Sequence, residues 1–221
     1  MISVDHLTKE FRLGTEVVRA LDDVSLRVER GEFVTVAGPS GSGKSTLLMS
    51  IGGLIHPTSG GVRIGDVNLY AQSVNVLAEL RRRTIGFVFQ QFHLIPYLTA
   101  WENVALPLML NGHQSRCHNE RAIGLLERFE LGSRANHKPS QLSVGQQQRV
   151  AMARMLANDP DVILADEPTA SLDPTLARHL VQTLTELNHA GKTVVLVTHS
   201  PELAAVGTRR LALHDGVIEE E

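Results

Sequence analysis

An α/β fold is predicted for this chain of 221 residues, because short apolar runs rich in β-branched residues alternate with stretches of helical periodicity. Two of these runs, residues 162–165 and 193–198, are apolar along almost their whole length, which is typical of strands buried on both faces of a parallel sheet. Only 4% of the residues are aromatic, 18 are glycine, and no unit repeats at a fixed period. We therefore expect a mostly parallel sheet covered by helices, in one domain that spans residues 1–221.

The first third of the chain is predicted to be rich in strands, followed by one helix. Alternating or apolar runs cover residues 2–7, 17–21, 24–28 and 32–37. A glycine-rich turn comes next, and a helix is expected from Lys44 to about Leu54, because Gly52, Gly53 and then Pro57 interrupt the pattern. The sequence thus predicts a unit of strand, loop and helix around Lys44.

The rest of the chain supplies further strands and an inserted group of helices. Strands are expected at residues 62–70, 85–90, 162–165, 193–198, 210–213 and 216–218. Helices are expected at residues 76–83 and 175–190, and the three arginines that end the first suit a helix C-terminus in solvent. From about residue 92 to 156 the periodicity is helical throughout, which indicates a helical subdomain.

Composition excludes several kinds of protein. The 21 Lys and Arg against 24 Asp and Glu give a net charge of −3, so a basic nucleic-acid-binding protein is not expected. The single cysteine, Cys117, excludes an intrachain disulfide, and together with His113 and His118 it offers three mixed ligands without a fourth, which makes a poor zinc site. No apolar run reaches the ~20 residues of a membrane helix, and the charged first residues indicate no secretory signal.

A phosphate-binding loop is predicted directly after the strand at residues 32–37. The pattern G-x-x-x-x-G-K-[ST] is met by Gly38, Pro39, Ser40, Gly41, Ser42, Gly43, Lys44 and Ser45, with Thr46 next in the helix. Glycines let backbone N–H groups converge on phosphates, and the helix N-terminus favours their negative charge. Lys44 is expected to reach the β- and γ-phosphates, and Ser45 to offer its hydroxyl to Mg²⁺.

Two adjacent carboxylates end the strand at residues 162–165 and predict hydrolysis of the nucleotide. Side chains alternate at the end of a strand, so Asp166 and Glu167 point to different tasks. Asp166 is expected to hold the Mg²⁺ shell, and Glu167 to face the attacking water as the general base. Without the phosphate-binding loop, two solvated acids would be the default interpretation.

With a third segment added, nearly the whole chain resembles the nucleotide-binding subunit of ATP-binding-cassette (ABC) transporters. This segment, Leu142-Ser143-Val144-Gly145-Gln146, resembles the signature motif of the family and leads into a helix. The family has glycine where this chain has Val144, whereas Ser143, Gly145 and Gln146 match. The resemblance implies an ABC ATPase fold of the P-loop NTPase class, with a mostly parallel core sheet, an N-terminal antiparallel β subdomain and the inserted helical subdomain.

The resemblance also implies a head-to-tail homodimer, with each ATP between the phosphate-binding loop of one copy and the signature segment of the other. Ser143, Gly145 and Gln146 would then contact the nucleotide of the second copy. This agrees with the predicted subdomain, because a helix start within it cannot serve the distant loop of its own chain. An ordinary serine N-cap is the alternative for Ser143.

Four further residues match functional positions of the family. Gln90 resembles the Q-loop glutamine, which contacts Mg²⁺ and the attacking water, and His199 resembles the switch histidine, which contacts the γ-phosphate. Asp173 belongs to a segment that resembles the D-loop and would reach across the dimer. Phe11 stands where the family stacks an aromatic ring on adenine, with core packing as the alternative.

One branch of the family is indicated by residues 87–104 and 106–108, which resemble cassettes for lipoprotein release and macrolide export. This branch implies an integral-membrane permease as partner, mechanical coupling through dimer closure, and a peripheral place at the cytoplasmic face of the inner membrane. Residues 92–98 would contact the permease, with buried core as the alternative. A non-transporting membrane signalling or cell-division complex is the second hypothesis. A soluble repair or translation ATPase is disfavoured, because the chain has one cassette and no heptad arm.

Overall fold

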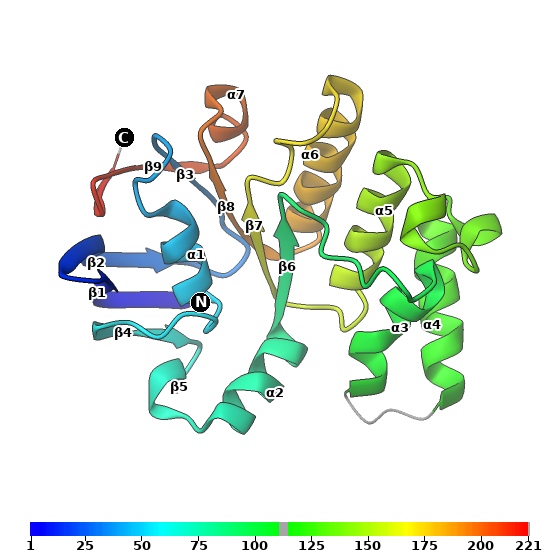
Figure 1. Ribbon diagram of the computed structural model, residues 1–221, viewed down its shortest axis with the longest axis horizontal. Coiled ribbons are helices and arrows are strands. Elements are labelled where there is room, and N and C mark those ends of the chain that lie inside the picture. The colour runs from blue at the N-terminus through cyan, green and yellow to red at the C-terminus, as the bar shows by residue number, and fades with distance from the viewer. Residues whose placement is uncertain (111–114, 221) are drawn as a thin grey trace.

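Two β-sheets and a lateral group of helices form the molecule (Figure 1). The structure is a computed structural model, and it describes residues 1–110 and 115–220. The core sheet has the strand order β10-β9-β3-β8-β7-β6. Its strands are β3 (Phe33–Ala37), β6 (Ile85–Phe89), β7 (Val162–Asp166), β8 (Thr193–Thr198), β9 (Arg209–His214) and β10 (Val217–Glu220). All neighbours pair in parallel except β9 and β10, so the sheet is mostly parallel as predicted.

The core sheet is buried on both faces, because its strands alternate between two hydrophobic clusters. In β7, Ile163 and Ala165 belong to one cluster, and Val162 and Leu164 belong to the other. The helical subdomain and α6 (Pro174–His189) complete the first cluster, while α1 (Lys44–Ile51) and the N-terminal sheet complete the second. This double burial explains the continuous apolar runs of the sequence.

The N-terminal sheet is antiparallel, with the strand order β2-β1-β4-β5. Its strands are β1 (Ile2–Leu13), β2 (Glu16–Val28), β4 (Ser59–Ile64) and β5 (Val67–Asn68). Its buried residues pack on α1, which separates it from the core sheet in Figure 1.

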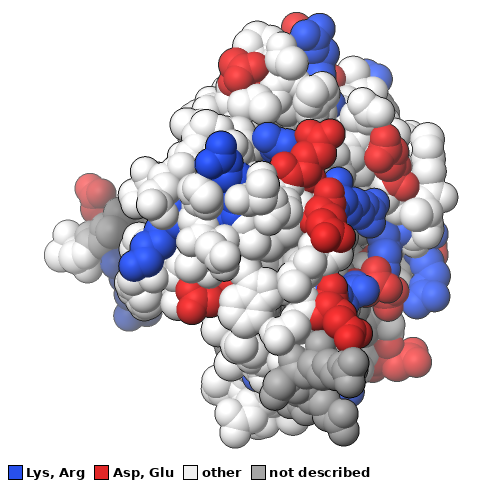
Figure 2. Space-filling view, turned by 90° about the vertical axis from the view of Figure 1, so that its right-hand side faces the viewer, with Lys and Arg blue, Asp and Glu red and all other residues white. Residues whose placement is uncertain are grey.

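Three helices form the helical subdomain on the β6 side of the core sheet, namely α3 (Ala100–Leu110), α4 (Ser115–Arg128) and α5 (Val144–Met155). The face that they present mixes Lys and Arg with Asp and Glu (Figure 2). The remaining helices are α2 (Val74–Thr84) and α7 (Pro201–Ala204), with 3₁₀ turns at Leu69–Ala71, Gly132–Arg134 and Pro139–Gln141. None of the described helices has the length and apolar character that crossing a membrane requires.

Several predicted bounds in the N-terminal part are wrong, because irregular backbone does not show in the hydrophobic pattern. Residues 17–21 and 24–28 belong to one strand, β2, which passes through a left-handed residue, Asp23 (φ 53°), and keeps its pairing with β1. β1 likewise continues to Leu13, past a left-handed His6 (φ 48°). The predicted strand at 62–70 divides into β4, β5 and a 3₁₀ turn, and the helix that begins at Lys44 ends at Ile51 rather than Leu54.

The helical character predicted from residue 92 begins only at Ala100, because residues 92–99 form a loop. A fully buried side chain of α3, Asn103, holds this loop. Its Nδ2 donates to the carbonyl oxygens of Ile95 (3.2 Å), Leu98 (3.2 Å) and Thr99 (3.0 Å), and its Oδ1 accepts from the Ile95 N–H (2.8 Å). One amide thus satisfies backbone groups that a helix would have paired internally.

We expect Asn103→Ala to lower the free energy of unfolding by about 2–4 kcal/mol, because it leaves several backbone groups of the loop without partners. The matched change Asn119→Ala, on the exposed side of α4, should stay within about 0.5 kcal/mol of the parent protein. Urea denaturation of the three proteins measures this difference. Equal stability of the two variants would contradict the role given to Asn103.

Candidate functional site

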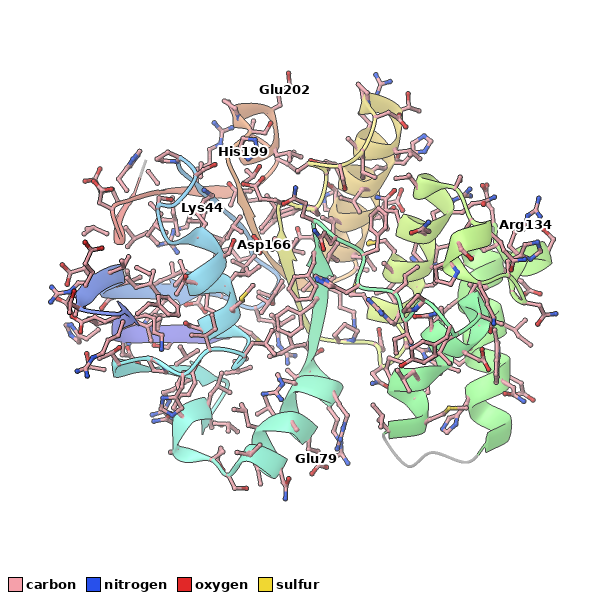
Figure 3. All side chains as sticks on the ribbon, viewed as in Figure 1. Lys44, Glu79, Arg134, Asp166, His199 and Glu202 are labelled. Carbon is pink, nitrogen blue, oxygen red and sulfur yellow. The ribbon has the colours of Figure 1, made fainter. Side chains whose placement is uncertain are left out.

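The carboxyl ends of β3, β7 and β8 lie side by side, and the segments that follow them build the site. Parallel pairing places Ala37, the end of β3, opposite Thr198, the end of β8. Asp166, the end of β7, lies opposite Val197. Figure 3 labels three side chains at this edge: Lys44, Asp166 and His199. The register of the sheet therefore brings together motifs that lie up to 161 residues apart in the sequence, from Gly38 to His199.

The glycine-rich loop after β3 borders an open cavity of about 270 Å³. The cavity is lined by residues of the loop and of α1 and by two distant residues: Ser40, Gly41, Gly43, Lys44, Ser45, Thr46, Ala20 and Glu167. Gly43 has a φ of 103°, and a Cβ atom there would lie 2.1 Å from the carbonyl oxygen of Ala20. Glycine is needed at this position because β2 approaches the loop closely.

Lys44 begins α1, and its side chain folds back onto the preceding loop. Its Nζ donates to the carbonyl oxygens of Gly38 (2.8 Å) and Pro39 (2.7 Å), and the residue is 6% exposed. An ammonium binds anionic oxygen more strongly than neutral carbonyl oxygen. The loop therefore holds the Lys44 ammonium beside the cavity, where oxygen atoms of an anionic ligand can replace the two carbonyl oxygens.

Ser45 and Asp166 lie within hydrogen-bond distance of each other beside the loop. The Ser45 Oγ donates to Asp166 Oδ1 at 2.9 Å. Burial is the main cause that raises the pKa of Asp166, and the adjacent Glu167 raises it further, while Ser45 and Lys44 lower it. A hydroxyl and a carboxylate are hard ligands of the kind that Mg²⁺ prefers, and a bound cation would offset the cost of burying the carboxylate charge.

Glu167 leaves β7 in a left-handed backbone conformation (φ 44°), and its N–H donates to the carbonyl oxygen of Val197 (3.0 Å). Its Oε2 accepts from the hydroxyl of Thr198 (3.2 Å), and its Oε1 lies 2.8 Å from Nδ1 of His199. The Glu167 side chain is 16% exposed, whereas that of His199 is 57% exposed. Strained backbone and two side-chain partners thus fix one carboxylate at the cavity.

Gln90 and Asp173 occupy the segments that flank the site. The carbonyl oxygen of Gln90 accepts from Ser171 Oγ (3.0 Å), while the residue itself is exposed. The Oδ1 of Asp173 accepts from the N–H groups of Thr175 (2.9 Å) and Leu176 (3.1 Å), so this carboxylate caps α6 of its own chain. The structure therefore ties the predicted Q-loop to the predicted D-loop through a backbone carbonyl.

The N-terminal end of α5 carries the predicted signature segment, and α5 lies on the other side of β6–β8 from α1 (Figure 1). Ser143 caps α5: its Oγ accepts from the N–H of Gln146 (3.3 Å), and Gln146 Oε1 accepts from the N–H of Ser143 (2.9 Å). A Cβ atom at Gly145 would lie 2.8 Å from the methyl groups of Leu176, so glycine lets α5 pack closely on α6. Val144 is 52% exposed. Within one chain, the ordinary N-cap interpretation of Ser143 is therefore correct.

Phe11 lies on the β1-β2 hairpin, where it pairs with Val18, two residues from the cavity residue Ala20. Its side chain is exposed, and the Lys9 Nζ lies 5.0 Å from the ring centroid. The alternative of core packing for Phe11 is therefore wrong, and the ring offers an exposed aromatic surface on the hairpin whose strand β2 reaches the cavity at Ala20.

The cluster considered for zinc carries no assignment. His113 lies outside the described residues, as does the side chain of Cys117, and His118 is buried in α4. Across residues 1–110 and 115–220, no three His, Cys, Asp or Glu side chains are grouped so as to hold a metal ion.

The structure gathers five predicted residues at one edge of the sheet: Lys44, Ser45, Asp166, Glu167 and His199. The signature residues Ser143, Gly145 and Gln146 belong instead to the helical subdomain. Sequence reasoning missed Thr198 and Ala20. The position of Thr198 at the end of a strand, directly before His199, was an available signal. Ala20 had none, because only the approach of β2 to the loop brings it to the cavity.

A glycine-rich loop between a parallel strand and a helix, a lysine at the start of that helix and a carboxylate pair on a neighbouring strand define a P-loop nucleotide-binding protein. A sequence profile described as "ABC transporter" matches residues 21–170. The chain belongs to the ABC transporter family, as an ATP-binding cassette with ATPase activity. The family, fold class and enzyme class predicted from the sequence are confirmed.

Similar proteins cover the whole chain. The uncharacterized ABC transporter ATP-binding protein MJ0796 of Methanocaldococcus jannaschii is 49% identical, over 100% of this chain and 96% of that protein. The macrolide export ATP-binding/permease protein MacB of Burkholderia pseudomallei is 46% identical over 99% of this chain, which spans only 33% of the MacB protein. Two dimeric structures of MJ0796, one bound to ADP and Pi, have a TM-score of 0.92 and cover 100% of this chain at 47% and 48% identity.

We expect Asp166→Asn to stabilise the protein at neutral pH. The folded-state pKa of Asp166 is raised above its unfolded value of ~3.9. As pH rises from the unfolded-state pKa through the folded-state pKa, the folded state therefore loses stability relative to the unfolded state. The amide cannot ionise, so the variant should be more stable than the parent protein at pH 7, with the gain shrinking toward pH 4. Urea denaturation at both pH values measures the change. A variant that is less stable than the parent protein at pH 7 would show that the buried charge of Asp166 does not destabilise the folded state.

Proposed function

We propose that this chain is the ATP-hydrolysing subunit of a membrane transporter that exports a substrate or extracts lipoproteins, and that it drives a separate permease mechanically. The grouping of Lys44, Ser45, Asp166, Glu167 and His199 at one cavity carries the proposal. Similarity to MacB over nearly the whole chain supports the export branch. A permease partner fits the same relative, because the chain matches a third of a protein described as both ATP-binding and permease.

ATP is proposed to bind with its phosphates at the loop of residues 38–43. Backbone N–H groups of this loop and of the α1 N-terminus face the bound anion. Lys44 Nζ exchanges the carbonyl oxygens of Gly38 and Pro39 for β- and γ-phosphate oxygens, a gain in charge-assisted hydrogen bonding. The exposed ring of Phe11 stacks on the adenine, beside Ala20.

Three oxygen ligands are proposed to hold Mg²⁺ with the nucleotide: the hydroxyl of Ser45, the carboxylate of Asp166 and the side-chain amide of Gln90. The 2.9 Å bond between Ser45 and Asp166 supports the first two. When bound, Mg²⁺ neutralises charge on the β- and γ-phosphates. The hydrogen bond to Ser171 uses the backbone carbonyl of Gln90, so it leaves the exposed side-chain amide available to the cation.

Glu167 is proposed to act as the general base. Thr198 and His199 orient its two carboxylate oxygens, and the residue lines the cavity that receives the phosphates. Glu167 takes a proton from water as the water oxygen attacks the γ-phosphorus and ADP leaves. The exposed imidazole of His199 is then placed to turn from Glu167 and donate a hydrogen bond to the γ-phosphate.

Two copies are proposed to complete each nucleotide site, head to tail. Ser143 and Val144 are exposed at the start of α5, across the core strands from the α1 of the same chain. A second copy would bring this helix N-terminus, with the Ser143 hydroxyl, to the γ-phosphate. The dimeric structures of the similar cassette MJ0796 support this arrangement. Asp173 would then approach the partner from the cap of α6.

The loop of residues 92–98 is proposed to contact a cytoplasmic helix of the permease. Tyr97 is 72% exposed, while the partly buried Leu94 packs on the hydrophobic cluster of the helical subdomain. A segment that is anchored on one side and exposes an aromatic ring on the other suits a packed socket. With such a partner, the chain would lie at the cytoplasmic face of the inner membrane as a peripheral subunit.

We expect Glu167→Gln to bind ATP but to hydrolyse it at least ~100-fold more slowly, because an amide cannot accept the proton of water. With hydrolysis blocked, the ATP-bound dimer should accumulate. A phosphate-release assay and size-exclusion chromatography with ATP and Mg²⁺ measure the two effects. Turnover at the parent rate would exclude Glu167 as the base. As a control, Lys44→Ala should lose nucleotide affinity instead.

The identity of the partner tests the transport proposal. We expect tagged Glu167→Gln protein, incubated with ATP and Mg²⁺, to recover a permease with a large extracytoplasmic domain from detergent-solubilised native membranes, as identified by mass spectrometry. Tyr97→Asp, at the exposed point of the loop, should reduce recovery without changing ATP binding. A signalling or cell-division membrane protein would favour the second hypothesis, and soluble ribosomal or DNA-associated partners would overturn the transporter assignment.

A further inference from the structure

Arg154, in the last turn of α5, binds the loop that follows Gln90. Its Nη1 donates to the carbonyl oxygen of His93 (2.7 Å), and its Nη2 donates to that of Phe92 (2.7 Å). Both bonds are short and charge-assisted, because an arginine keeps its positive charge. The guanidinium therefore fixes two neighbouring backbone groups of the loop to α5.

The opposite end of α5 carries the signature segment. Ser143 caps the helix, and the twelve residues Val144–Met155 span about 18 Å. α5 packs on α3, α4 and β6. In the proposed dimer, one end of this helix meets the nucleotide of the second copy, and the other end holds the loop proposed to contact the permease.

Beyond their close contact at Gly145, α5 and α6 border a groove. This groove of about 470 Å³ separates the two helices, with Gln148 and Met152 on one wall and His179 and Thr183 on the other. Because α5 is one continuous helix packed on α3, α4 and β6, a displacement of its N-terminus is carried to its other end as a rigid element.

Four side chains bind residues 90–99 from different directions, and one of them, Glu102 of α3, accepts from the N–H of Thr99 (2.7 Å). Ser171 binds the carbonyl of Gln90, Asn103 binds the carbonyls of residues 95, 98 and 99, and Arg154 binds those of 92 and 93. Within the described part of the chain, Arg154 supplies the only side-chain hydrogen bonds from α5 to this loop. The direct hydrogen-bonded connection from α5 to the loop is thus this one guanidinium.

We propose that Arg154 is a positioning residue that transmits ATP occupancy at the signature end of α5 to the loop of residues 92–99. The inference rests on the proposed function, because it requires the ATP-bound dimer. When the nucleotide of the second copy shifts the N-terminus of α5, Arg154 carries the carbonyl groups of Phe92 and His93 with it. Without the guanidinium, the dimer still forms and the loop no longer follows.

Arg121 provides a matched control in the same subdomain. Its Nε donates to the carbonyl oxygen of Ala157 (2.5 Å), and its Nη2 donates to that of Leu156 (3.2 Å). Arg121→Met thus removes an arginine that binds two consecutive carbonyls, as Arg154→Met does, but these carbonyls lie outside the loop.

Hydrogen exchange with mass spectrometry tests the inference in the Glu167→Gln background, with and without ATP and Mg²⁺. In this parent, ATP should change the exchange rates of residues 92–99 by at least about threefold. Adding Arg154→Met should leave the ATP-dependent dimer in size-exclusion chromatography but reduce the change to less than about half. Adding Arg121→Met should preserve it. The readout is the ATP-dependent difference, which a merely structural role would leave in place.

An ATP response of the loop that persists in the Arg154→Met protein would overturn the inference. Should that variant fail to fold, Arg154→Lys decides, because its ammonium keeps the charge but not the two-pronged geometry. A lysine variant with dimer formation and a full response would also contradict the inference, whereas a reduced response supports it. A Glu167→Gln parent that forms no ATP-dependent dimer would overturn the proposed function, and this inference with it.

Discussion

Parallel pairing of β3, β8 and β7 places Ala37, Thr198 and Asp166 within one residue of each other in register, at the carboxyl ends of these strands. Everything at the cavity depends on this register, because a one-residue slip of a strand moves its side chains to the opposite face. The register is in turn fixed by the two hydrophobic clusters, which take alternate residues of each strand. The packing of the core thus also determines the geometry of the site.

Two features of the site are locally unfavourable in free energy, and the packing of the core around them outweighs this cost. Glu167 has a left-handed backbone, and Asp166 is an acid whose pKa burial raises. Such features persist only where the surrounding structure over-determines them. Here β7, which carries Asp166, and its neighbour β8 are almost fully buried. Phosphates and a divalent cation are the ligands that would relieve these costs, which is the physical reason to regard the arrangement as functional.

Much of this site could be predicted from the sequence, because its chemistry follows strand ends directly: Lys44 after β3, Glu167 after β7 and His199 after β8. The predicted bounds were wrong where the backbone is irregular. The left-handed residues His6 and Asp23 lengthen strands that the hydrophobic pattern ends early. Residues 92–99 have helical periodicity but form a loop, because buried Asn103 satisfies their backbone groups. Such tertiary hydrogen bonds leave no periodic signal.

One chain supplies a phosphate-binding loop and a signature helix that lie apart within it, and the proposed nucleotide site forms where they meet between two copies. Complementation tests this most directly. Lys44→Ala and Ser143→Arg are each expected to abolish ATP hydrolysis, by damaging opposite halves of the composite site. In a mixed dimer, one site carries both defects and the other none, so mixing the two inactive proteins should restore ATPase activity. A mixture that stays as inactive as its components would contradict the composite site.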